Sequence, residues 1–238
     1  MDVHEREVRR ERRVRVPRAR GKDRGGPVRV VRSHPDERRQ HPLSNGRRLA
    51  RTRGRVADRK TLKSKVCLVG EIAVGKTSLI RRYVQDMFDD KYIMTIGTKI
   101  SKKTVRLEGV RGAHDVTLDM TIWDIMGEKG FRQLLKEAYF YGANGILAIC
   151  DLTRTNTLED LDDWIDHVLK VVGEIPVYIV VNKVDLKEGA KFDDDAVRAF
   201  AKAYNAPWSY ASAKTGENVQ DAFEAIGRAM AEQQMSAK

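Results

Sequence analysis

The sequence predicts an α/β fold, a six-stranded and mostly parallel sheet with five helices distributed over both faces. Two observations lead to this prediction. From residue 65 onwards, short apolar runs alternate with segments of helical periodicity, the order that right-handed β–α–β crossovers require. The runs 145–151 and 176–181 are almost wholly apolar, which is typical of strands buried on both faces of a parallel sheet.

The predicted elements follow one another without an internal repeat. The strand 66–69 leads into a loop with two glycines and then into a helix over 76–88, whose apolar residues recur every three to four positions. A polar loop at 89–98 precedes two alternating segments, 100–107 and 116–123, which predict an antiparallel hairpin at the sheet edge. The later elements are a helix near 131–141, the strand 145–151, a helix over 157–172, the strand 176–181, a helix over 193–204, a short strand at 208–211 and a last helix over 218–232.

Charge divides the chain into two parts. Residues 1–60 carry 21 Lys and Arg against 8 Asp and Glu, or +13, whereas residues 61–238 carry 24 against 26, or −2, which together give the net +11. The first part has 19 arginines and lacks Phe, Trp, Tyr and Ile, so it cannot bury enough apolar surface to offset the entropy of ordering, and we expect it to be disordered. It is a solvated, dispensable stretch, a stretch upstream of the true start of translation, or a tether for polyanions such as nucleic acid or anionic lipid.

The cysteines and the hydropathy bear on location. Cys67 and Cys150 lie in apolar runs and are expected in the core, with no disulfide framework. No apolar run reaches the roughly 18–20 residues of a membrane span, and no signal-peptide core is evident. We therefore expect a cytoplasmic protein, with or without a peripheral attachment to a membrane. The last five residues contain no cysteine, so we expect no prenylation.

The loop between the first strand and the first helix is the first candidate site. It matches the polyphosphate-binding pattern G-x-x-x-x-G-K-[ST]. Gly70 and Gly75 let the backbone turn its N–H groups toward a phosphate, and the following helix directs its positive end there. Lys76 is expected to reach the phosphates, and the Thr77 hydroxyl is expected to hold Mg²⁺. The predicted nucleotide-binding residues of this segment are Gly70, Glu71, Ile72, Ala73, Val74, Gly75, Lys76, Thr77 and Ser78.

Further polar residues stand where other predicted strands end, the edge at which open α/β sheets bind ligands. They are Thr95, Asp124-x-x-Gly127, Asn182-Lys183-x-Asp185 and Ser212-Ala213-Lys214. In order and spacing the set resembles a small GTPase of the Ras superfamily. The segments Tyr92-x-x-Thr95-Ile96-Gly97 and Ile122-Trp123-Asp124 are most similar to the Rab branch. The resemblance covers about residues 64–233 and implies a P-loop NTPase with a Ras-like G domain over residues 61–238.

The resemblance implies how guanine would be read. Asp185 would accept two hydrogen bonds from guanine, and adenine would leave this carboxylate unsatisfied, which favours GTP over ATP. The Lys183 stem would lie along the base, and Asn182 would tie the base-binding loop to the phosphate loop. The Ala213 N–H would face the base, and Phe88 would stack on it edge-on. Ser212 and Lys214 complete the predicted base-binding residues.

The resemblance also implies a magnesium-dependent switch. Mg²⁺ prefers octahedral oxygen ligands, which Thr77, Thr95 and, through water, Asp124 would supply. Gly127 would donate its N–H to the γ-phosphate, so that loss of this phosphate would release Thr95 and Gly127 together. The expected catalytic residues are Lys76, Thr95, Gly127 and Glu128.

Two departures from the family pattern bear on catalysis. Glu128 stands where the family usually has a glutamine that orients the attacking water. A carboxylate can accept a proton from water, but it cannot donate to the γ-phosphate and is repelled by it, which leaves the sign of its effect on the rate open. Ile72 and Ala73 occupy loop positions that are often glycine, and a branched side chain at Ile72 could obstruct an arginine supplied by an activating protein.

The function that these residues predict is that of a GTP/GDP switch with slow intrinsic hydrolysis. Its expected partners are effector, exchange and activating proteins, and it is expected to be a monomer. One alternative is a GTP-binding scaffold or sensor that has lost hydrolysis. Another is a nucleic-acid-associated GTPase tethered by the basic segment. An ATP-driven kinase is disfavoured by the residues at 182–185.

Overall fold

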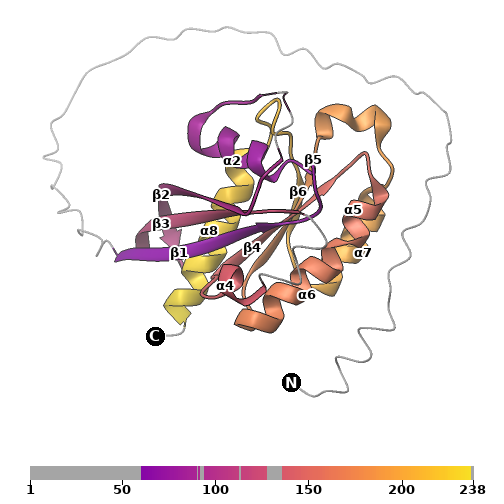
Figure 1. Cartoon of the computed structure of the whole chain (residues 1–238). Coiled ribbons are helices and arrows are strands. Elements are labelled where there is room, and N and C mark those ends of the chain that lie inside the picture. The colour runs from indigo at the N-terminus through magenta and orange to yellow at the C-terminus, as the bar shows by residue number, and fades with distance from the viewer. Residues whose placement is uncertain (1–59, 90, 92–93, 113, 128–135, 237–238) are drawn as a thin grey trace, which may run out of the picture. The chain divides into compact units, whose positions relative to one another are not determined.

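The computed structural model describes residues 60–89, 91, 94–112, 114–127 and 136–236. Its strands are β1 (Lys60–Val69), β2 (Thr98–Val110), β3 (His114–Ile125), β4 (Gly145–Asp151), β5 (Val177–Asn182) and β6 (Trp208–Tyr210). They form one six-stranded sheet in the order β2-β3-β1-β4-β5-β6 (Figure 1). Every neighbouring pair is parallel except β2 and β3, which form the antiparallel hairpin at one edge. The predicted α/β fold is confirmed.

Helices cover both faces of this sheet (Figure 1). They are α2 (Lys76–Gln85), α4 (Lys136–Phe140), α5 (Thr155–Glu159), α6 (Leu161–Val172), α7 (Asp194–Ala203) and α8 (Val219–Ser236), with a 3₁₀ turn η1 (Val184–Gly189). Helices α2 and α8 pack on one face, where the Tyr83 and Phe223 rings stack with centroids 4.1 Å apart. Helices α4 to α7 pack on the other face around the buried Trp164.

Strands β4 and β5 are parallel neighbours in the sheet. Every residue of both strands is buried, because helices cover the two faces toward which successive side chains point. Cys67 and Cys150 are free and fully buried, as expected, and burial raises the pKa of the Cys67 thiol to about 12. Because these strands end side by side, the loops that follow them both start from a fully buried part of the sheet.

The strand boundaries differ from the prediction chiefly in β1. The strand begins at Lys60 rather than at residue 66, and residues 60–65 pair with β3 from Val116 onward. This first part alternates exposed and buried residues, with Leu62 and Ser64 buried, so it lacks the continuous apolar run on which the shorter prediction was based. The hairpin strands β2 and β3 are also longer than predicted.

Two helices also differ from the prediction. Helix α2 ends at Gln85 instead of residue 88, because Asp86 adopts a left-handed conformation with φ of 53°. The single helix predicted over 157–172 is divided into α5 and α6 at Asp160, whose ψ of −14° departs from the regular helical value. The turn η1 was not predicted.

Two of the predictions concern residues outside the ranges that the structure describes. Residues 1–59 lie outside the described residues, so the expected disorder of the arginine-rich segment and its boundary with the domain stay predictions. Residues 131–135 of the predicted helix near 131–141 also lie outside them, and α4 accounts for the remainder. Among the described helices, none is both long enough and apolar enough to cross a lipid bilayer.

Candidate functional site

A cavity of about 440 Å³ opens where several strands end. It is lined by residues at or just beyond the carboxyl ends of β1, β3, β5 and β6, together with the segment between α2 and β2. This is the edge at which an open α/β sheet binds ligands. Among the predicted site residues, those that line the cavity are Ile72, Ala73, Gly75, Lys76, Thr77, Ser78, Phe88, Thr95, Gly127, Asn182, Lys183, Asp185, Ala213 and Lys214.

The loop after β1 requires its two glycines. Gly70 has a φ of +137°, and a Cβ there would lie 2.1 Å from the carbonyl oxygen of Ile149. Gly75 has a φ of +101°, and a Cβ there would lie 2.2 Å from Nδ2 of Asn182. A larger residue would displace the Ile149 backbone at the first position and the buried Asn182 side chain at the second. Helix α2 begins directly after Gly75, so its positive end borders the cavity.

Lys76 is the buried cation of this loop. Its side chain is only 7% exposed, and its Nζ donates to the carbonyl oxygens of Gly70 (2.7 Å) and Glu71 (2.8 Å). Burial lowers the pKa of Lys76 to about 8, because the ammonium is largely removed from water. An anion in the cavity would therefore stabilise the charged form. The carboxylate of Glu71 is also buried and accepts from the indole N–H of Trp164 (3.3 Å). The backbone carbonyl of Glu71 is the group that accepts from Lys76.

Three oxygens from three segments meet next to the lysine. The hydroxyl of Thr77 donates to Oδ2 of Asp124 (2.5 Å) and lies 2.9 Å from the hydroxyl of Thr95. Asp124 is 1% exposed, and within the described part of the chain its other oxygen, Oδ1, has no hydrogen-bond partner. Burial raises the pKa of Asp124. The unpaired carboxylate oxygen of Asp124 and the hydroxyls of Thr77 and Thr95 are oxygen ligands of the kind that a hard cation prefers.

Because the side-chain donors at this position are all oxygens, they favour a metal ion that prefers oxygen ligands. Within the described ranges, no group of three or more His, Cys, Asp and Glu side chains is arranged to hold a metal ion. A metal at Thr77 would therefore need oxygen ligands from elsewhere, such as water and phosphate. Mg²⁺ accepts such a mixed set and usually keeps several waters.

Asn182 connects the two sides of the cavity. Its Nδ2 donates to the carbonyl oxygen of Val74 in the phosphate loop (2.8 Å), and its Oδ1 accepts the backbone N–H of Ala213 (3.2 Å). The side chain is 1% exposed. The end of β5, the phosphate loop and the loop after β6 are thereby held together by one buried amide.

Asp185 is oriented from behind by a serine. The buried hydroxyl of Ser212 donates to Oδ1 of Asp185 (2.6 Å) and accepts the N–H of Thr215 (3.1 Å). Ser212 itself does not line the cavity, and neither do Gly70, Glu71, Val74 and Asp124, which support the lining residues from outside. Phe88 lines the cavity and packs against the core beside α2.

The segment after β3 begins at the cavity and continues beyond the described residues. Gly127 is buried, and a Cβ there would lie 2.6 Å from Nζ of Lys76 and from the backbone N of Ile72. A side chain would therefore displace the phosphate loop. Glu128, predicted as a catalytic residue, lies outside the described residues, so its role stays a prediction.

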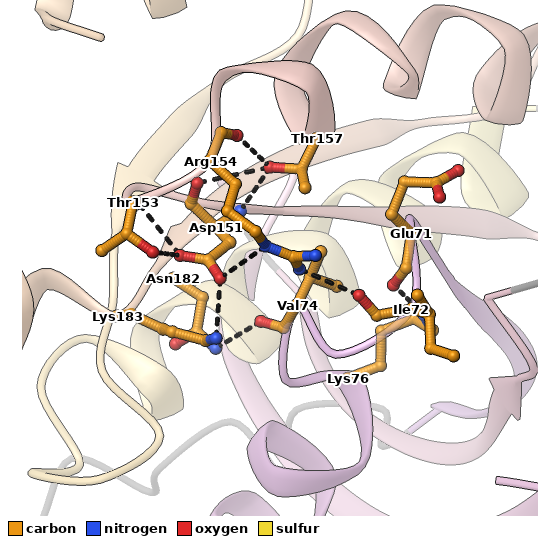
Figure 2. Close-up of polar contacts among 10 residues, drawn as sticks. All are labelled: Glu71, Ile72, Val74, Lys76, Asp151, Thr153, Arg154, Thr157, Asn182 and Lys183. Atoms are coloured by element: carbon orange, nitrogen blue, oxygen red, sulfur yellow. Dashed lines mark hydrogen bonds and ion pairs between the residues drawn. The ribbon is translucent and has the colours of Figure 1, made fainter. Parts of the chain in front are cut away.

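Sequence reasoning missed a polar cluster at the end of β4, which we call the Asp151 cluster (Asp151, Thr153, Arg154 and Lys183; Figure 2). Asp151 is 1% exposed. Its Oδ1 accepts from the backbone N–H (2.9 Å) and hydroxyl (2.7 Å) of Thr153, and its Oδ2 lies near Lys183 Nζ (2.6 Å) and Arg154 Nε (3.0 Å). Burial alone would raise the pKa of Asp151, but the hydrogen bonds from Lys183 and Thr153 outweigh it and lower that pKa. The signal was available, since Asp151 ends a fully buried strand at the edge that carries the other motifs.

Comparison with known proteins agrees with this arrangement. The family model described as the Ras family matches residues 65–232. The GTP-binding protein YPTM1 of Zea mays is 32% identical over 167 residues, which is 70% of this chain and 77% of the relative. The Ras-related protein Rab-7b of Mus musculus is 34% identical over 172 residues, 71% of this chain and 82% of the relative. The Ras-related protein Rab-1D of Dictyostelium discoideum is 31% identical over 165 residues, 69% of this chain and 78% of the relative. The chain therefore belongs to the Ras superfamily of small GTPases, and within that superfamily it is Rab-like.

Proposed function

We propose that this protein binds GTP and GDP with Mg²⁺ in the cavity described above and acts as a switch that hydrolyses GTP slowly. One observation carries the proposal. A complete phosphate loop and the Asn182–Asp185 loop border the same cavity, and Asn182 joins them through a hydrogen bond to Val74. A nucleotide has a charged end and a flat polar end, and the cavity offers a matching group for each.

The phosphate end would be held by the loop backbone, the positive end of α2 and Lys76. The Lys76 ammonium is nearly removed from water and is paired only with carbonyl oxygens among the described contacts. A polyphosphate would add its negative charge to that of the Asp124 and Glu71 carboxylates, which already favour the charged form of the lysine. The same cation would favour GTP over neutral ligands of similar size.

The hydroxyls of Thr77 and Thr95 and the carboxylate of Asp124 are the residues that would hold Mg²⁺, the last through water. Bound Mg²⁺ would neutralise phosphate charge and fix the orientation of the β- and γ-phosphates. Thr77 is fixed by the start of α2, whereas Thr95 lies in the segment that leads into β2. The contact between Thr95 and Thr77 would therefore depend on what occupies the cavity.

Guanine would be selected at Asp185. Ser212 already donates to one carboxylate oxygen, which fixes the plane of the group and leaves acceptor capacity toward the cavity. Guanine presents two adjacent donors to such a carboxylate. Adenine presents no such pair, so its binding would leave the acceptor capacity of Asp185 that faces the cavity without a donor from the base.

Slow hydrolysis is proposed from two positions. Ile72 is 38% exposed and lines the cavity, so its branched side chain lies where an arginine from an activating protein would approach. Glu128 replaces the donor that usually orients the attacking water. The isoleucine would obstruct stabilisation of the charge that develops on the γ-phosphate, and the carboxylate would remove a donor while keeping an acceptor for the attacking water.

The switch would involve the two ends of the β2–β3 hairpin. Thr95 lies just before β2 and Gly127 just after β3, and both line the cavity. Loss of the γ-phosphate would remove a partner from both residues at once. Effector, exchange and activating proteins would then distinguish the two states at this hairpin edge.

Single-turnover hydrolysis tests the proposal. The full chain would be purified, its bound nucleotide identified, and [γ-³²P]GTP turnover followed with and without Mg²⁺. We expect bound guanine nucleotide and slow, Mg²⁺-dependent release of phosphate. Glu128→Gln should then show whether the carboxylate helps or hinders. Bound GTP without turnover over hours would favour a scaffold, and the absence of guanine nucleotide binding would refute the proposal.

A further inference from the structure

Arg154 connects two parts of the site that lie far apart in the sequence. It lies in the turn between β4 and α5, where it is the residue immediately before the helix. Its Nε lies 3.0 Å from Oδ2 of Asp151, and its Nη2 donates to the carbonyl oxygen of Ile72 in the phosphate loop (2.9 Å). Figure 2 shows the guanidinium between these two acceptors. One planar group thus bonds a strand end and a loop 82 residues earlier in the chain.

Asp151 fixes this guanidinium and a second cation at the same oxygen. Oδ2 is also 2.6 Å from Nζ of Lys183, a residue of the base-binding loop that lines the cavity. Oδ1 is saturated by the backbone and hydroxyl of Thr153. The carboxylate is almost fully buried, so it cannot exchange these partners for water without cost. A continuous path therefore runs from Lys183 through Asp151 and Arg154 to Ile72.

This path is separate from the bond between Asn182 and Val74. Asn182 holds the loop at Val74, and Arg154 holds it at Ile72, two residues earlier. The positive charge of Arg154 also lies close enough to Lys76 to lower the pKa of that lysine, although burial is the larger cause. The guanidinium therefore adds positive potential at the site proposed for the phosphates.

We propose that Arg154, oriented by Asp151, is a positioning residue that couples the base-binding loop to the phosphate loop and slows the release of bound nucleotide. The inference rests on the proposed function, because it concerns the same cavity. Its consequence is specific. An intact bridge at Ile72 requires the fork of an arginine, since a lysine ammonium on a flexible stem cannot bond both acceptors in the same plane.

Release of a fluorescent N-methylanthraniloyl derivative of GDP, chased with excess GDP, tests this coupling on the full chain. We expect Arg154→Gln to accelerate release about tenfold or more, the scale of a lost hydrogen bond from a charged group. Arg154→Lys keeps the charge but not the fork, so it should recover only a small part of the effect. Complete recovery by lysine would mean that charge alone is sufficient and would overturn the positioning role.

The Asp151 step of the path has its own test. Asp151→Asn should accelerate release at least as much as Arg154→Gln, because it frees both Arg154 and Lys183. If the two residues act along one path, the double variant should release nucleotide no faster than Asp151→Asn alone. Multiplied effects in the double variant would contradict the coupling.

A matched control is present on α7. Arg198 pairs with Asp195 at the same i, i+3 spacing and at 3.1 Å, but both side chains are exposed and neither borders the cavity. Arg198→Gln should leave release unchanged. If the wild type does not bind the fluorescent GDP at all, the proposed function fails. If it binds and both Arg154 variants release like the wild type, only the present inference fails, and the unfolding midpoint of each variant shows that it is folded.

Discussion

Replacing Asn182 by alanine tests whether one buried amide holds the two sides of the cavity together. The amide makes two hydrogen bonds, to the carbonyl of Val74 and from the N–H of Ala213. Both partners are buried, so alanine would leave an unsatisfied acceptor and an unsatisfied donor. Each such group costs about 1–3 kcal/mol. Because both groups belong to loops beside a cavity that water enters, we expect the lower half of the summed range, about 2–4 kcal/mol.

This loss should appear in nucleotide retention. The strands on either side keep their pairing in the variant, whereas the two loops lose their common anchor. About 2 kcal/mol corresponds to roughly thirtyfold, so GDP release measured by fluorescence should accelerate at least that much. Asn182→Asp keeps the volume and the acceptor for Ala213 but faces the Val74 carbonyl with an oxygen, so it should be no better than alanine.

Asn144 provides the control for this substitution. Its Oδ1 accepts the N–H of Lys65 (2.8 Å) just before β4 begins, and it does not line the cavity. Asn144→Ala should lower the free energy of unfolding in urea by about 1 kcal/mol and leave GDP release unchanged. The reasoning would be refuted if Asn182→Ala released GDP within twofold of the wild type, or if Asn144→Ala accelerated release equally.

Three further predictions follow from the same site. Thr77→Ala removes a proposed magnesium ligand, so EDTA should accelerate GDP release from the wild type but hardly from the variant. Gly127→Ala places a Cβ 2.6 Å from Nζ of Lys76, so binding of a GTP analogue should weaken about tenfold or more while GDP binding changes less. Because the hydrogen bonds from Lys183 and Thr153 together outweigh burial and lower the pKa of Asp151, its carboxylate stabilises the fold fully above about pH 4. The difference in free energy of unfolding in urea between wild type and Asp151→Asn should therefore shrink as the pH falls through the lowered pKa that Asp151 has in the folded state.

The sequence was sufficient for the parts of the fold that rest on local patterns. The apolar run of β4 predicted a strand buried on both faces, and all of its residues are buried. Cavity-lining residues such as Lys76 and Asp185 could be predicted because parallel strands bring their carboxyl ends to one edge. The spacing of the motifs along the chain was then enough to predict that these residues lie around one cavity.

The remaining features depend on contacts that no local pattern encodes. The first six residues of β1 have only two buried side chains, and their pairing with β3 decides that they form a strand. The sequence analysis did not single out Arg154, and its contact with Ile72 involves only a backbone carbonyl of that residue. Every residue type has a backbone carbonyl, so the sequence does not show which residue will accept a hydrogen bond through that group.

This dependence on backbone groups explains how an unusual phosphate loop keeps its shape. Ala73 has a φ of +61°, a left-handed conformation that costs a non-glycine residue about 1–2 kcal/mol. The carbonyls on its two sides are held from outside, that of Ile72 by Arg154 and that of Val74 by Asn182. These two hydrogen bonds, at about 1 kcal/mol or more each, are sufficient to offset the strain. Because neither bond touches the side chain of residue 72, a bulky isoleucine can replace a small residue there without loosening the loop, and its effect is confined to the cavity that it faces.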